Sequence, residues 1–129
     1  MIPAQLDLPL WTNSDLNEEF QVRNGSAPVY LVGYTATMQW RRFARSTVIL
    51  KTFGTVADLN SEGIFFIEPT VFRLQIKKET IKAVYDALLP NVEPGEPAIL
   101  SHDIVFTMPG NFSDTWFQGS ARIRLGVTR

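Results

Sequence analysis

Cysteine is absent from this sequence of 129 residues, and its absence removes several kinds of chemistry. Without thiols the chain has no disulfide bond, no zinc–thiolate or iron–sulfur site and no cysteine nucleophile. Small secreted domains usually depend on disulfides for their stability, so we expect a chain that folds in a cytosol.

Long apolar runs are absent as well. No run approaches the roughly 20 residues that a helix needs to cross a bilayer. The N-terminal sequence MIPAQLDLPLW has neither the basic start nor the long apolar core of a signal peptide. The net charge of −1 gives the whole chain no attraction to nucleic acid or to an anionic membrane, so we expect neither as a partner.

Charge of one sign is missing from each of two segments. Residues 1–19 contain acids but no Lys or Arg, and residues 20–57 contain bases but no acid. A basic segment can mark a binding face. We favour the plainer interpretation, in which Arg41, Arg42 and Arg45 occupy solvated positions on a strand and a loop.

Alternation of apolar and polar residues, the pattern of a half-buried strand, runs through most of the chain. The longest such stretch covers residues 29–41, with Gly33 as the natural place for a bulge. We expect its inward face to hold Tyr30, Val32, Tyr34, Ala36, Met38 and Trp40. Further strands are predicted over residues 19–23, 47–53, 63–67, 71–78, 98–108, 115–118 and 120–127.

The two predicted strands nearest the C-terminus carry more specific expectations. Trp116 and Phe117 are adjacent, so one of the two should be exposed or lie at a sheet edge. In the last strand, Leu125 and Val127 belong to the row of side chains that we expect to face inward.

One segment, residues 79–89, follows a helical period instead, and Pro90 ends it. The apolar residues that recur there at the spacing of one helical face are Ile81, Val84, Tyr85 and Leu88. The sequence therefore predicts a mainly all-β fold, an antiparallel β-sandwich of about seven or eight strands with one short helix near residues 79–89.

The length fits one domain. Within it, we expect residues 1–16 to form an extended N-terminal arm and residues 17–129 to form a single β-sandwich domain. The arm could fold back onto its own sandwich or dock onto a neighbouring subunit, for example by adding a strand to an exposed edge. In the second case Leu8, Leu10 and Trp11 are the candidate partner-binding residues.

Catalytic groupings are scarce. His102 is the one histidine, and the adjacent Asp103 points to the opposite face of the same strand. We therefore interpret His102 as a hydrogen-bonded core residue. No glycine-rich phosphate loop or metal-binding motif occurs. We predict that the chain is not an enzyme and that it uses no cofactor and no metal.

An ordered set of short motifs resembles a known family. The motifs are Leu31–Ala36 (LVGYTA), Met38–Arg41 (MQWR), Phe72–Leu74 (FRL), Glu79–Thr80 (ET), His102–Ile104 (HDI), Phe117–Gly119 (FQG) and Val127–Arg129 (VTR). Over about residues 18–129 the chain resembles the small β-sandwich domains of tailed bacteriophages and prophages, of the type found at the N-terminus of the baseplate upper protein. His102 stands where the family usually has tyrosine before the aspartate.

The resemblance implies a virion structural or adaptor protein in the tail, baseplate, neck or fibre anchor. Its partners would be other phage structural proteins and further copies of itself as a homo-oligomer. It would be assembled in the cytoplasm of the bacterial host, and no catalytic residues carry over. The alternative is a carbohydrate- or receptor-binding sandwich module, with Trp11 or Trp116 as the stacking residue.

Overall fold

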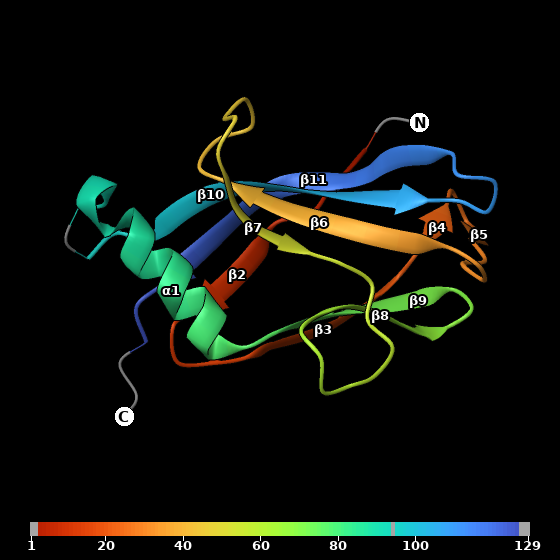
Figure 1. Cartoon of the computed structure of the whole chain (residues 1–129), viewed down its shortest axis with the longest axis horizontal. Helices are drawn as coiled ribbons and strands as arrows, with labels where there is room; N and C mark the ends of the chain where they lie inside the picture. Colours follow the sequence, from red (N-terminus) through yellow and green to blue (C-terminus); the bar gives the residue numbers. More distant parts are fainter. Residues whose placement is uncertain (1–2, 94, 127–129) are drawn as a thin grey trace.

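Two β-sheets face each other in the computed structural model, which describes residues 3–93 and 95–126 (Figure 1). The strands of the larger sheet are β1 (Ala4–Gln5), β2 (Leu8–Trp11), β6 (Thr35–Arg41), β7 (Ile49–Phe53), β10 (Ala98–Thr107) and β11 (Ser113–Arg124). They run in the order β1-β11-β10-β6-β7, and β2 also pairs with β11.

The smaller sheet has three strands in the order β3-β9-β8. They are β3 (Leu16–Gln21), β9 (Val71–Ile76) and β8 (Gly63–Glu68). A hairpin of β4 (Arg23–Asn24) and β5 (Ala27–Pro28) lies beyond β3, and Gly25 at its tip has a φ of +66°. The helix α1 (Lys78–Leu88), followed by the 3-10 turn η1 (Leu89–Asn91), crosses one end of the sandwich (Figure 1).

The core lies between the sheets. Alternate residues of β6 and β10 point into it, as the period of two predicts, and they are Ala36, Met38, Trp40, Leu100, His102, Ile104 and Phe106. Phe72 of β9 meets Phe106 of β10 with ring centroids 5.5 Å apart and planes inclined by 71°. This edge-to-face contact joins the two sheets at the centre of the core.

The predicted helix is confirmed almost residue for residue. All four residues of its apolar stripe, Ile81, Val84, Tyr85 and Leu88, are buried. Its first turn is capped from outside, because the Asp15 carboxylate accepts a hydrogen bond of 2.7 Å from the Lys78 amide. A mostly β fold with one short helix is thus confirmed. The sheets are antiparallel except at β11, where β1 and β2 pair with it in parallel.

The N-terminal segment is not an arm that extends from the sandwich. Leu8 pairs with Ala121 and Leu10 with Ile123, so β2 belongs to the larger sheet, and the boundary predicted at residue 16 does not separate two units. Gly119 makes this docking possible, because a Cβ atom there would collide with the Leu6 carbonyl oxygen.

The long strand predicted over residues 29–41 is shorter than expected. β6 begins at Thr35, and residues 29–34 form a loop in which the Tyr34 amide donates to the Leu31 carbonyl at 3.0 Å. Gly33 has a φ of +83°, a conformation that favours glycine and that ends the extended chain there. Tyr30 and Val32 are therefore exposed, contrary to the prediction, and Leu31 is buried instead.

The two strands predicted near the C-terminus form one strand, β11. Ile104 pairs with Phe117 and Val105 with Thr115, so Trp116 is the extra residue of a β-bulge. The bulge brings both aromatic rings to Phe106, with Trp116 buried and Phe117 half-buried, so neither ring is exposed. The other alternative of the prediction, a place at a sheet edge, fits Trp116, because β1 pairs with β11 only from Phe117 onward. Leu125 is exposed, contrary to prediction, and Val127 lies outside the described residues.

Candidate functional site

The three residues predicted to bind a partner have different surroundings. Leu8 and Leu10 are 2% and 1% exposed and lie in the chain's own core, so the structure favours the alternative in which the segment folds back. Trp11 stays 44% exposed, with the Arg124 guanidinium 5.7 Å from its ring centroid. Of the three candidates, only Trp11 presents its side chain at the surface.

His102 is a core histidine, as predicted. Its Nε2 atom lies 2.6 Å from the Leu6 carbonyl oxygen, which only accepts hydrogen bonds, so Nε2 carries the proton. Burial is the largest influence and lowers the pKa of His102, while the bond to Leu6 and the charges of Asp103 and Asp7 act against it. The neutral ring therefore fastens the N-terminal segment to β10.

Asp7 fastens the same segment to β11. Its Oδ1 atom accepts hydrogen bonds from the Ser120 amide at 3.1 Å and from Gln5 Nε2 at 2.8 Å. These bonds lower the pKa of Asp7, with the Ser120 amide as the largest cause. His102 and Asp7 thus hold the N-terminal segment against β10 and β11.

Arg41, Arg42 and Arg45 of the basic segment differ in their surroundings. Arg41 is half-buried, and it donates to the Ser46 carbonyl at 3.1 Å and to Gln39 Oε1 at 2.6 Å. Arg42 and Arg45 are exposed on the loop between β6 and β7. This placement agrees with the interpretation of a strand residue followed by solvated loop residues.

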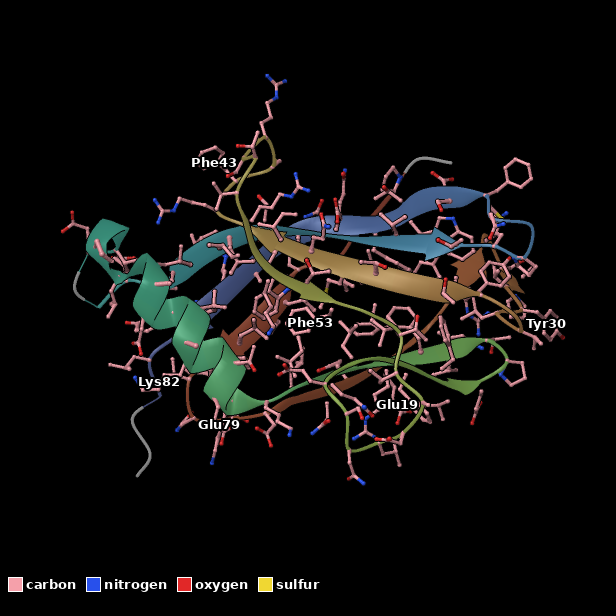
Figure 2. The ribbon with its side chains drawn as sticks, in the orientation of Figure 1. Glu19, Tyr30, Phe43, Phe53, Glu79 and Lys82 are labelled. Atoms are coloured by element: carbon pink, nitrogen blue, oxygen red, sulfur yellow. The ribbon has the colours of Figure 1, made fainter. Side chains whose placement is uncertain are left out.

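At one end of the sandwich, two loops present large apolar side chains and contain no charged residue. We name it the uncharged end, and it consists of the loops over residues 29–34 and 108–112, which meet where Gly33 approaches Pro109 (Figure 1). Tyr30, Val32 and Phe112 are 68%, 75% and 73% exposed there. Figure 2 shows Tyr30 projecting from this end.

The sequence around the uncharged end also lacks charge. Residues 24–40 and 104–113 contain no Asp, Glu, Lys, Arg or His. These two runs are a signal that the sequence offers, but it becomes meaningful only when the fold brings the two loops together. An exposed apolar patch of this kind is a mark of protein interaction sites.

A second candidate surface lies on the outer face of the larger sheet. Gln5, Gln118, Asp103 and Gln39 are neighbours in register across β1, β11, β10 and β6 and form one polar row. A groove of about 350 Å³ follows this row, and we name it the polar groove. Its other lining residues are Arg41, Ala44, Ser101, His102 and Gly119.

The polar groove was not predicted from the sequence. Its residues occupy the outward positions that alternate with core residues such as Trp40 and Ile104. Each strand alone shows an ordinary solvated face, and only the register places the three glutamines and Asp103 in one row. Exposed Phe43, one residue before Ala44, stands on the loop above this face (Figure 2).

The described residues contain neither a cluster of metal ligands nor a membrane-spanning helix. Over residues 3–93 and 95–126, no group of three or more His, Asp or Glu side chains is placed to hold a metal ion. Within the same part of the chain, no helix has the length and apolar character needed to cross a membrane.

Comparison with known proteins gives no family assignment. No protein-family model matches the chain, and no curated protein matches it. The resemblance to phage β-sandwich domains therefore stays a prediction from the motifs.

Proposed function

We propose that this chain is a structural or adaptor protein of a tailed-phage particle and that it acts through protein–protein assembly. The observation that carries the proposal is the uncharged end, where Tyr30, Val32 and Phe112 are each more than two-thirds exposed. Removing apolar surface of this kind from water is the main favourable contribution to most protein association.

The absence of charge at this end defines what fits it. A partner that covers residues 29–34 and 108–112 does not strip water from an ionised side chain of these loops, which would cost several kcal/mol per ion without a partner charge. The complementary surface should therefore be apolar and uncharged too. In a phage particle, it would belong to another structural protein or to a further copy of this chain.

The size of the end favours an assembly with several contacts. Two aromatic side chains with most of their area exposed present roughly 200–350 Å². A stable interface buries about 800 Å² per partner, so the uncharged end is the centre of an interface and not the whole of it. Repetition of modest contacts around a symmetric particle gives the tight binding that one contact lacks.

The sequence resemblance supports the same surface. Its first motif, Leu31–Ala36, covers the second half of the loop over residues 29–34 and the start of β6. In the proposed role, the protein is located in the virion after assembly in the cytoplasm of the bacterial host.

Co-expression with the head, neck and tail proteins encoded by adjacent genes tests the proposal, followed by affinity capture and light scattering at micromolar concentration. We expect a stoichiometric complex or a defined homo-oligomer. Tyr30→Ser combined with Phe112→Ser should weaken it at least tenfold. Leu59→Ser is the matched control, because Leu59 is also an exposed apolar loop residue but lines a different groove, together with Asn17 and Lys77.

A strictly monomeric chain with no affinity for any of these proteins would refute the assembly role. A complex that survives the double substitution unchanged would place the interface elsewhere. The alternative function, carbohydrate or receptor binding, no longer has Trp116 as a stacking residue, because that side chain is buried. A different surface favours it, the polar groove.

A further inference from the structure

The polar groove is lined mainly by residues of paired strands, so the backbone positions that carry these side chains are fixed. Gln118, Asp103 and Gln39 belong to three adjacent strands whose backbone groups pair within the sheet on both sides. These side chains therefore stand in fixed rows about 4.8 Å apart. A ligand in the groove meets a preformed arrangement, which is the usual condition of a small-molecule site.

The wall of the groove presents donors and acceptors in an alternating order. Gln39 uses its Oε1 atom to accept from Arg41, which leaves its amide nitrogen as a donor. Gln5 uses its Nε2 atom to donate to Asp7, which leaves its carbonyl oxygen as an acceptor. Asp103 adds acceptors, and Gln118 and Ser101 add groups of both kinds.

The charges in the groove exclude most ionic ligands. An anion would be repelled by Asp103, and the terminal nitrogens of Arg41 already bond to Gln39 and the Ser46 carbonyl. A cation would meet one carboxylate, that of Asp103, and would be repelled by the Arg41 guanidinium of the same lining. With one positive and one negative side chain, the lining is neutral in sum, so the complementary ligand is neutral and polar.

We propose that the polar groove binds a neutral carbohydrate. A sugar hydroxyl both donates and accepts, so a row of hydroxyls satisfies the mixed wall of Gln5, Gln118, Asp103 and Gln39. A volume of about 350 Å³ lies in the range of small-ligand sites. Ala44 is an apolar residue of the lining that the C–H side of a sugar ring can meet, and exposed Phe43 precedes it in the same loop.

A peptide fits this surface less well than a sugar. Extended peptides bind mainly by adding a strand to an open sheet edge. The groove instead runs across β11, β10 and β6, which are interior strands of the larger sheet with no unpaired edge. This inference goes beyond the assembly role and does not depend on it, because the groove and the uncharged end share no residue.

The test is a titration of the whole ¹⁵N-labelled chain with glucose, galactose, mannose, N-acetylglucosamine, cellobiose, lactose and chitobiose. Side-chain amide resonances of Gln5, Gln39 and Gln118 report directly on the groove. We expect saturable shifts of these resonances for at least one sugar, with a Kd of about 1 mM or below. Glucuronic acid and glucosamine are charged analogues of glucose. Each should bind at least tenfold more weakly than the best neutral monosaccharide.

Two variants and one control locate the site. Asp103→Asn keeps the side-chain shape but removes the charged acceptor, and Gln118→Ala removes an exposed amide, so each should weaken binding about tenfold. Gln21→Ala removes an exposed glutamine of β3 on the other sheet and should leave binding unchanged. Circular dichroism and the thermal midpoint of each variant separate lost binding from lost folding.

Three results would overturn the proposal. The first is no shift of the three glutamine resonances by any neutral sugar up to about 50 mM, where even weak millimolar sites are filled. The second is binding that Asp103→Asn and Gln118→Ala leave unchanged while both variants stay folded. The third is tighter binding of uncharged peptides than of any sugar at the same resonances.

Discussion

Two segments of this chain carry similar alternating patterns but have opposite surroundings in the structure. Residues 1–16 were predicted to form an arm that either folds back onto its own sandwich or docks onto a neighbour, and Leu8 and Leu10 are buried in the chain's own core. Tyr30 and Val32 were expected to face the core, yet both are exposed at the uncharged end. Alternation shows that a segment has two faces, but the partner that covers one of them is set by topology.

The comparison teaches that the same pattern has different energetic consequences in the two places. In the N-terminal segment, the apolar residues hold the fold together through parallel pairing with β11. At the uncharged end, they add little to the fold and stay available to another molecule. Substitutions should therefore separate stability at the first segment from association at the second.

Leu10→Ala should have the largest effect on stability. Leu10 is 1% exposed beside Ile123, so its truncation leaves a cavity and costs about 2–5 kcal/mol in the free energy of unfolding. Urea denaturation followed by tryptophan fluorescence measures the cost. Trp11→Ala, at an exposed neighbour, should cost much less. A loss at Leu10 that shrinks with rising protein concentration would mean that the segment docks onto a second copy.

How much was predictable depends on whether the signal is local. The helix stripe from Ile81 to Leu88 and the alternation of β6 and β10 are local, so the mainly β fold with one helix followed from the sequence. The bulge at Trp116 and the parallel docking of β2 depend on pairing between distant residues. Neither a periodicity nor a motif contains that information.

The candidate surfaces follow the same rule. The core position of His102 was predictable, because a single histidine in a row of apolar residues is expected to be buried and to form a hydrogen bond within the core. The polar groove was not, because its row of Gln5, Gln118, Asp103 and Gln39 combines one residue from each of four strands. The uncharged end needed the contact between two loops that are about 75 residues apart.

Gly33→Ala should have the next largest effect. Gly33 has a φ of +83°, and a Cβ atom there would lie 3.1 Å from Pro109 Cγ. The left-handed conformation costs a residue with a side chain roughly 1–2 kcal/mol, so the free energy of unfolding should fall by about that amount. Gly25→Ala, also at positive φ but with open space around its Cβ position, separates conformational strain from contact with Pro109. If Gly33→Ala cost nothing, residues 29–34 would be extended after all.

The pH dependence of stability tests how the N-terminal segment is held. Burial lowers the folded-state pKa of His102 below the ordinary value of 6.5. On acidification, the unfolded chain therefore takes up the proton first. The contribution of the neutral, buried ring to the free energy of unfolding is complete above pH 6.5 and is lost as the pH falls through 6.5 toward the folded-state pKa. His102→Gln keeps a donor for the Leu6 carbonyl without a titrating ring.

The measurement is urea denaturation of the wild type and the variant at several pH values between about 7 and 5, above the ordinary range of carboxylates. Stability of the wild type should decline on acidification, and the His102→Gln variant should decline less. The pKa of Asp7 is lowered, so the stability that Asp7 contributes is lost only below its ordinary pKa of 3.8. The titrations of Asp7 and His102 therefore affect stability in separate pH ranges. An equal decline in both proteins would assign the pH dependence to another group.

Tyr30→Ser should have the smallest effect on the isolated chain. The side chain is 68% exposed on a loop, and substitutions at such positions usually change the free energy of unfolding by no more than about 0.5 kcal/mol. Phe112→Ser, at 73% exposure on the neighbouring loop, should behave in the same way. Thermal and urea denaturation of both single variants at low protein concentration give the values. A cost above 2 kcal/mol would mean that these side chains pack within the chain, and the uncharged end would then lose its role as a surface kept for a partner.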